Sequence, residues 1–162
     1  MITLSDLKLE EYERVWSWAN FPRSAFFDDF GPKTAEEFKA LLAIRLATEY
    51  VWGVYSHSVD GAPNKGSLIG YAGATEINPL TAQLRGMVLD PKHRGKGYGI
   101  ETLKLVKLML IQRGYNKVMG SCFSTNGRMI SVFRKVSAER EGFLKNVTEV
   151  GGISTDLILW SM

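Results

Sequence analysis

The longest regular pattern along the chain is an apolar stripe at helical spacing in its second half. Ile100, Leu103, Val106 and Leu110 recur every three or four residues, and charged side chains fill the opposite positions. This spacing places the four apolar side chains on one face of an amphipathic helix. Gly114, which directly follows an arginine, ends the predicted helix.

Short segments rich in β-branched and aromatic residues surround this helix. The turn-rich segment 60–66 separates the first two of them, Asp90-Pro91 stops the third, and Gly151-Gly152 joins the last two. The composition predicts strands at Tyr50–Ser56, Ser67–Ile77, Leu84–Leu89, Lys117–Phe123, Phe143–Val150 and Ile153–Trp160.

Three more helices are predicted from the residues at their ends. Ser5-Asp6 indicates the N-cap of a first helix. A second helix runs from about Ala35 to Thr48, where Thr34 is the N-cap and Glu37 completes a capping box. A third begins at Gly127 and reaches Val136 or beyond.

The order of these elements predicts the fold class. Hairpins come first, a strand–loop–helix–strand unit follows, and a hairpin closes the chain, which is typical of an α+β or α/β domain with a mixed sheet. The length of 162 residues suits one domain, and no repeat or linker divides it. We therefore expect a single domain over residues 1–162.

Composition narrows the protein class. The chain is 45% apolar and 23% charged, as in ordinary soluble globular proteins. No apolar stretch has the length of a membrane span. A signal segment starts with basic residues that an apolar stretch follows, whereas residues 1–20 of this chain carry acidic groups. Cys122 is the sole cysteine, so no internal disulfide can form. We expect a cytoplasmic protein without a membrane partner.

Charge is unevenly distributed along the chain. The net charge of +3 is too small to indicate a nucleic-acid partner. Residues 91–145 hold twelve Lys and Arg against three Asp and Glu, and the remainder holds eight against fourteen. A basic half that faces a polyanion and an acidic half that faces a cation suit an enzyme with two substrates. Solvated surface charge explains the same distribution, so charge alone does not decide.

A glycine-rich loop, Arg94-Gly95-Lys96-Gly97-Tyr98-Gly99, directly precedes the amphipathic helix. Glycine lets a backbone approach another molecule closely, and a helix start presents unpaired N–H groups and the positive end of its dipole. Because two cations accompany the glycines, the loop predicts a phosphate site; a structural turn is the alternative. Neither the dinucleotide fingerprint nor the Walker pattern has this spacing.

The pattern that fits is Arg94-x-x-Gly97-x-Gly99, with Pro91 before it and Ile100-Glu101 after it. It resembles the acetyl-CoA signature of the GNAT superfamily of acyltransferases. The likeness extends over residues 67–160, and among the branches the chain looks closest to the ribosomal-protein N-terminal acetyltransferase-like group. The resemblance implies a GNAT-like mixed, mostly antiparallel sheet of about six or seven strands flanked by helices. It also implies a V-shaped splay between two parallel central strands.

The resemblance implies acetyl-CoA as co-substrate and no metal. The pantetheine arm would pair with exposed strand backbone, and a backbone N–H near Val88 would polarise the thioester carbonyl. Loop amides would hold the pyrophosphate, with charge from Arg94 and Lys96. Asn126 would hydrogen-bond the pantetheine, although a helix N-cap role fits it equally. The expected cofactor-binding residues are Met87, Val88, Leu89, Arg94, Gly95, Lys96, Gly97, Tyr98, Gly99, Ile100 and Asn126.

The resemblance further implies direct attack by an amine, which a base must deprotonate. Glu76 is the first candidate, because the family arrangement puts the end of its strand beside the thioester; a surface carboxylate is the alternative. Glu101 is a weaker candidate. Many relatives protonate the leaving thiolate with a tyrosine from a late helix, and Phe133 stands near that place. Ser131 is the candidate acid, although it follows Asn126 by five residues where the branch pattern has three. Gly142-Phe143 also comes several residues later than that pattern has it, so the segment Arg134–Glu141 contains extra chain.

The expected acceptor is the primary amine of a small molecule or of a protein N-terminus. Relatives build the acceptor site from their N-terminal part, where this chain has the acidic pair Asp28-Asp29, which offers a site for a cationic acceptor. The aromatic side chains there are mostly expected in the core, with one or two lining the acceptor cleft. They are Trp16, Trp18, Phe21, Phe26, Phe27 and Phe30.

Two other functions fit the same loop. One is an acyl-CoA-binding module without catalysis, and the other is a regulatory domain that binds ATP or NAD. Cys122 has no His–Asp or His–Glu pair near it in sequence, which favours a buried apolar role over that of a nucleophile. Two histidines and one cysteine lie too far apart along the chain to predict a metal site. A monomer and a homodimer are both compatible with the sequence.

Overall fold

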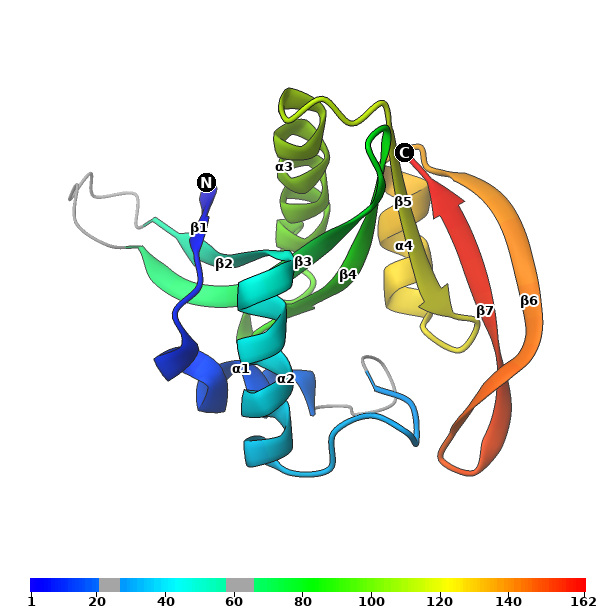
Figure 1. Ribbon diagram of the computed structural model, residues 1–162, viewed down its shortest axis with the longest axis horizontal. Coiled ribbons are helices and arrows are strands. Elements are labelled where there is room, and N and C mark those ends of the chain that lie inside the picture. Colours follow the sequence, from blue (N-terminus) through cyan, green and yellow to red (C-terminus); the bar gives the residue numbers. More distant parts are fainter. Residues whose placement is uncertain (21–26, 58–65) are drawn as a thin grey trace.

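A computed structural model describes residues 1–20, 27–57 and 66–162. One seven-stranded sheet organises this part of the chain, in the order β1-β2-β3-β4-β5-β7-β6 (Figure 1). The strands are β1 (Ile2–Asp6), β2 (Tyr50–Ser56), β3 (Ser67–Asn78), β4 (Thr81–Leu89), β5 (Lys117–Phe123), β6 (Glu139–Val150) and β7 (Ile153–Ser161). The helices are α1 (Tyr12–Ala19), α2 (Ala35–Thr48), α3 (Tyr98–Gln112) and α4 (Gly127–Lys135), with short 3-10 turns at Leu9–Glu11 and Pro91–His93.

Neighbouring strands are antiparallel except at the centre of the sheet, where β4 and β5 are parallel. Their pairing covers three residues on each strand and ends at Gln83 opposite Met119. Beyond that pair the two strands diverge, as Figure 1 shows. The predicted mixed sheet with a splay between parallel strands is therefore confirmed.

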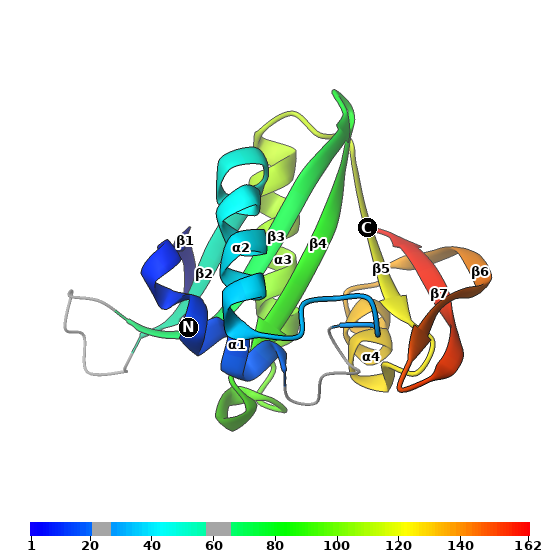
Figure 2. The same ribbon diagram turned by 60° about the horizontal axis from the view of Figure 1, so that its bottom comes forward.

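Helices cover both faces of the sheet (Figure 2). On one face α1 and α2 pack against alternate strand positions that include Tyr71 and Val88. On the other face α3 and α4 pack against the intervening positions, among them Ala72 and Met87. This alternation follows from the two-residue period of a strand. Two apolar layers thus hold the central strands from both sides.

The first strand corrects the sequence interpretation. Ser5 and Asp6 end β1 and do not cap a helix; the first helical turn begins at Leu9. The pairing of Ile2–Asp6 with Trp52–Ser56 explains the difference, because an antiparallel partner far along the chain stabilises an extended conformation that local signals do not reveal. Glu101 on α3 supports the strand by accepting a hydrogen bond from the Ile2 N–H at 3.0 Å.

The closing hairpin is longer than predicted. β6 begins at Glu139, four residues before the predicted start, and its pairing with β7 has irregularities between Arg140 and Gly142 and between Leu144 and Thr148. The segment Arg134–Glu141 finishes α4, turns through Ser137 at a φ of 57°, and starts β6. The predicted turn lies outside the described residues except for Gly66, and Phe21 and Phe26 also lie outside them. No helix in the described segments has the length and hydropathy to cross a membrane.

Candidate active site

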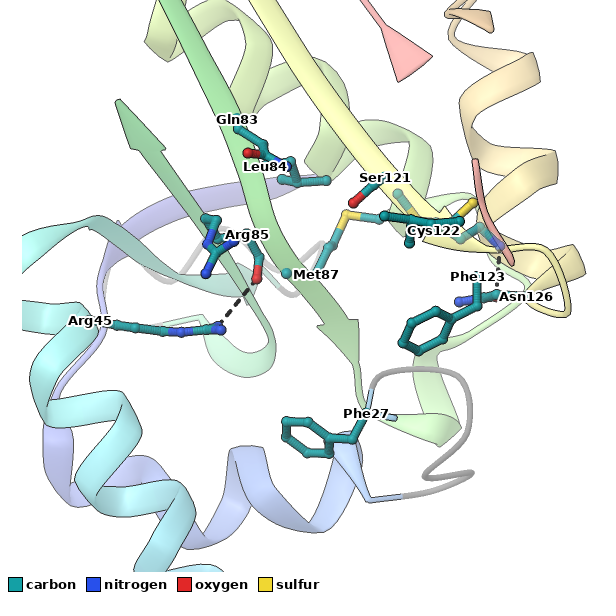
Figure 3. Close-up of a pocket in the computed structure, with 13 residues that line it drawn as sticks. Phe27, Arg45, Gln83, Leu84, Arg85, Met87, Ser121, Cys122, Phe123 and Asn126 are labelled. Carbon is teal, nitrogen blue, oxygen red and sulfur yellow. Dashed lines mark hydrogen bonds between the residues drawn. The ribbon is translucent and has the colours of Figure 1, made fainter. Parts of the chain in front are cut away.

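A cavity of about 200 Å³ opens where β4 and β5 separate (Figure 3). Backbone and side chains of both strands form its walls, α4 closes one end, and α2 with Phe27 closes the other. None of the described residues that line it is Asp or Glu. The lining consists of Phe27, Arg45, Gln83, Leu84, Arg85, Gly86, Met87, Ser121, Cys122, Phe123, Asn126, Met129 and Leu157.

A β-bulge in β4 lies at the centre of this cavity. Gly86 pairs with Gly73 on β3 and Leu84 pairs with Ala74, so that Arg85 has no partner in the register. A bulge bends its strand and turns the extra side chain in a new direction. The bulge follows the last β4–β5 pair by two residues, and the cavity opens at the same place.

The free edge of β4 begins just beyond the pairing with β5. Of the three residues expected to hold pantetheine, Met87 lines the cavity, and the side chains of Val88 and Leu89 are buried in the two apolar layers. Because the described β4–β5 register stops at Gln83, the β5-facing backbone of these residues has no strand partner there. Such an edge can accept an extended ligand as if it were another strand.

The glycine loop follows the end of β4. Gly95 and Gly97 have φ angles of +78° and +86°, and a Cβ at either would meet no described atom within 4 Å. Gly97 is the N-cap of α3. In the described part of the chain, the N–H groups of residues 95–99 make no hydrogen bond to protein atoms. Five successive amides and an open space beside the backbone therefore fit an anionic ligand.

The structure corrects the expectation that the Ile100 amide binds the cofactor together with the loop. The Ile100 N–H donates to the carbonyl oxygen of Gly97 at 3.0 Å and so belongs to the first turn of α3. Ile100 is the third residue of α3, where an N–H group usually has no partner in the helix, but here it makes a bond of the 3-10 type to the residue three positions before it. Its amide is not available to a phosphate.

The two cations of the loop have different surroundings. The Arg94 guanidinium donates to the carbonyl oxygens of Leu89 at 2.9 Å and of Trp18 at 3.0 Å. Burial lowers the pKa of Arg94, and Arg128 nearby acts in the same direction. Arg94 thus ties the loop to the ends of β4 and α1, whereas Lys96 is exposed. Within the loop, Lys96 is the more exposed of the two cations.

Glu76 does not lie where the proposed base was expected. β3 is antiparallel to β4, so Glu76 pairs with Ala82 near the start of β4, on the still-paired side of the splay. Its Oε2 atom accepts a hydrogen bond of 2.7 Å from Tyr115, whose hydroxyl lies 3.0 Å from that of Tyr50. The hydrogen bonds with Tyr50 and then Glu76 raise the pKa of Tyr115. This geometry favours a structural role for Glu76.

Replacing Glu76 tests that role. In Glu76→Gln the amide oxygen still accepts from Tyr115, and we expect kcat/KM to stay within about twofold of the native value, since no contact with the cavity is lost. The pH dependence of kcat/KM should also be unchanged. Loss of the acidic limb of that profile, together with a fall in kcat of about 100-fold, would instead identify Glu76 as the base.

The residues expected on α4 divide into two groups. Asn126 lines the cavity and also caps the helix, since its side chain accepts from the Met129 N–H at 3.1 Å. Ser131 is exposed and is not among the cavity-lining residues. Phe133 is fully buried and stacks on Trp160 with ring centroids 5.2 Å apart. The structure therefore brings Asn126, and neither Ser131 nor Phe133, to the cavity.

The acidic pair Asp28-Asp29 holds the closing hairpin. Asp28 accepts from the Thr148 hydroxyl at 2.7 Å, and the two carboxylate oxygens of Asp29 accept from the N–H groups of Gly151 and Gly152 at 2.9 and 2.7 Å. Neither aspartate lines the cavity. The cationic-acceptor role considered for them therefore has no support in the geometry. Of the aromatics described in this region, Phe27 lines the cavity and packs on Trp16.

Sequence reasoning missed several cavity residues. Arg45 lies on α2 and Ser121 on β5, far from the glycine loop along the chain. A signal existed for Ser121, because it alternates with buried residues on a strand predicted to flank the splay. Cys122 also lines the cavity, and burial raises the pKa of its thiol, which disfavours the thiolate a nucleophile needs. The described residues contain no cluster of three or more potential metal ligands.

Comparisons with known proteins identify the family of this chain and proteins that share its fold. A model of the Acetyltransferase (GNAT) family matches residues 8–137, so the chain belongs to the GNAT acetyltransferase family. No curated protein matches the sequence. The glycine loop and the β4–β5 splay both lie within the matched residues.

Solved structures share the fold. An N-acetyltransferase from Staphylococcus aureus Mu50 is 18% identical with a TM-score of 0.78, over 100% of this chain and 98% of that one. The spermidine N-acetyltransferase from Vibrio cholerae, solved in complex with CoA and spermine, is 18% identical with a TM-score of 0.80, over 99% and 94%. A GNAT-family acetyltransferase from Bacillus anthracis is 17% identical with a TM-score of 0.79, over 99% and 93%.

Proposed function

We propose that this protein is an acetyl-CoA-dependent N-acetyltransferase that moves an acetyl group to a primary amine within one ternary complex. The observation that carries the proposal is the free edge of β4 together with the five unpaired amides at residues 95–99. Family membership supports the same reaction class. When bound, acetyl-CoA supplies an acetyl group activated as a thioester.

In this proposal the chain binds the cofactor mainly through hydrogen bonds of its backbone. In our proposal the amides of residues 95–99 donate to the pyrophosphate and the exposed Lys96 adds charge, while Arg94 holds the loop in shape. Met87, Val88 and Leu89 offer their backbone to the pantetheine arm, and Asn126, the N-cap of α4, lines the same cavity as Met87. The absence of side chains at Gly95 and Gly97 leaves room for the phosphates.

The cavity residues also bear on the chemical step. A buried thiol with a raised pKa makes a covalent intermediate at Cys122 unfavourable, which supports direct transfer. Ser121 has its hydroxyl in the cavity between the two strands (Figure 3). We assign it the hydrogen bond to the leaving sulfur in place of the exposed Ser131.

Cofactor binding and turnover together test this function. We expect calorimetry to give a Kd for acetyl-CoA at least about tenfold below those for ATP and NAD, because only acetyl-CoA offers both a pyrophosphate and an extended amide-bearing arm. A thiol-reactive dye should then report CoA release when primary amines are added. Acetyl-CoA binding without release by any amine would support the non-catalytic binding module, and preferred binding of ATP or NAD would support the nucleotide-binding domain.

Several finer assignments extend the proposal. The ribosomal-protein N-terminal acetyltransferase-like branch predicts a protein N-terminus as acceptor, and small-molecule amines are the other class. The V. cholerae neighbour is a spermidine N-acetyltransferase by its own description. With its lone cysteine, we propose that the enzyme works in the reducing cytoplasm, as a monomer or homodimer.

A further inference from the structure

Two arginines line the end of the cavity that lies under α2. Arg45 reaches it from α2 and Arg85 from the bulge in β4 (Figure 3). The Nη1 atom of Arg45 donates to the Tyr71 hydroxyl at 3.0 Å and to the main-chain carbonyl of Arg85 at 3.2 Å. The guanidinium of Arg45 is therefore fixed in orientation beside the bulge, and its side chain is only 15% exposed.

The charge in this corner is not balanced. Among the described residues, Glu49 is the carboxylate that faces both arginines, 3.9 Å from the Nε atom of Arg45 and 3.7 Å from that of Arg85. Two guanidinium groups thus share one carboxylate. In the described part of the chain, neither the Nη2 atom of Arg45 nor the guanidinium of Arg85 donates a hydrogen bond. Unused donors and one excess positive charge therefore adjoin the cavity.

We infer that the acceptor is a small amine that also carries a carboxylate, such as an amino acid, with the carboxylate bound between Arg45 and Arg85. This inference rests on the proposed acetyltransferase function, because that function requires the amine of the bound acceptor to point toward the β4–β5 splay. A guanidinium presents paired N–H donors that match the two oxygens of a carboxylate. The fixed guanidinium of Arg45 has already lost its conformational freedom, which reduces the entropic cost of binding.

The same charges disfavour the other acceptor classes. A polyamine brings further positive charge to a corner that already has an excess of it. A peptide N-terminus carries a neutral amide where an amino acid carries its carboxylate, so it leaves the arginines without a partner. The excess charge also lowers the pKa of a nearby ammonium group and so raises the fraction of neutral, nucleophilic amine. That effect matters because no carboxylate lines the described cavity.

Product-like ligands test the inference without requiring turnover. N-acetylglycine has the acetamide and the carboxylate, N-acetylglycine methylamide replaces the carboxylate as a peptide would, and spermidine represents the polyamines. We expect NMR titration, with and without CoA, to show N-acetylglycine binding at least about tenfold more tightly than its methylamide. Arg85→Gln should abolish that difference. Lys104→Gln removes the same charge from the exposed face of α3 and should preserve it.

The outcomes separate this inference from the proposed function. Equal affinity for N-acetylglycine and its methylamide, or tighter binding of spermidine, would overturn the carboxylate site. A preference that survives Arg85→Gln would also overturn it. A carboxylate preference in a protein that binds no acetyl-CoA would instead overturn the acetyltransferase proposal and leave the anion site in place.

Discussion

Gly97→Val is expected to raise the Kd for acetyl-CoA by at least about 100-fold, because it removes two or more charge-assisted hydrogen bonds, each contributing about 1.5–3 kcal/mol. Gly97 has a φ of +86°, and its Cβ would project into a space with no described atom within 4 Å. That space is where the proposal puts the pyrophosphate. A branched side chain fills it and also pulls the backbone away from the left-handed region.

A matched glycine separates lost binding from backbone strain. Gly114 has a φ of +99° and likewise no described atom within 4 Å of its Cβ, but it follows α3 at the opposite end from the loop. Gly114→Val should lower the stability by a similar amount, about 1–3 kcal/mol, without changing the affinity for acetyl-CoA. Calorimetry and thermal unfolding of both variants check this. Native affinity in Gly97→Val would mean that these amides do not hold the phosphates.

Phe133→Tyr is expected to destabilise the protein by about 3 kcal/mol and to leave kcat no higher. Phe133 stands near the place where many GNAT relatives have a catalytic tyrosine. Here its ring tip lies against the backbone of β5, since a Cβ on Gly120 would come within 2.6 Å of the Phe133 Cζ atom. A hydroxyl at that atom has no room, and the side chain is fully buried.

Thermal unfolding and steady-state rates measure this effect. For a chain of this size, about 3 kcal/mol corresponds to a fall in Tm of roughly 6–12 °C. Phe143→Tyr makes the same chemical change on β6, where the side chain is 40% exposed, and should leave Tm unchanged. A more active Phe133→Tyr variant of native stability would show that its hydroxyl reaches the cavity and serves as the acid.

The elements best predicted from the sequence are those with local causes. The predicted bounds of α2 match the structure, and the Thr34 hydroxyl caps the helix by accepting from the Glu37 N–H at 3.2 Å. The glycine loop and the start of α3 were also foreseen, because positive φ angles and a helix start are properties of a few neighbouring residues. These features depend on the chain within about one helical turn.

Features that depend on strand pairing were predicted less well. Ser5-Asp6, at the end of β1, was interpreted as a helix cap. The strand is stabilised by pairing with β2 about 50 residues later, and the local sequence does not show that partner. Glu76 was expected beside the thioester, but the antiparallel register pairs it with Ala82 at the other end of β4. A shift of one residue in the pairing register moves a side chain to the other face of the sheet, and the direction of pairing decides which strand end it lies beside. The sequence of one strand does not contain that information.

By itself, the amino-acid sequence determined the glycine-rich loop before an amphipathic helix and the mixed-sheet domain around it, and the resemblance of that loop indicated the GNAT family. Glycine conformation, helix capping and apolar periodicity are short-range effects, so a single chain read in order is enough to detect them. Only the tertiary structure decided which side chains meet in the cavity. The bulge at Arg85 and the packing of α2 bring two arginines to one corner and leave the expected carboxylates outside it, because long-range packing sets those positions.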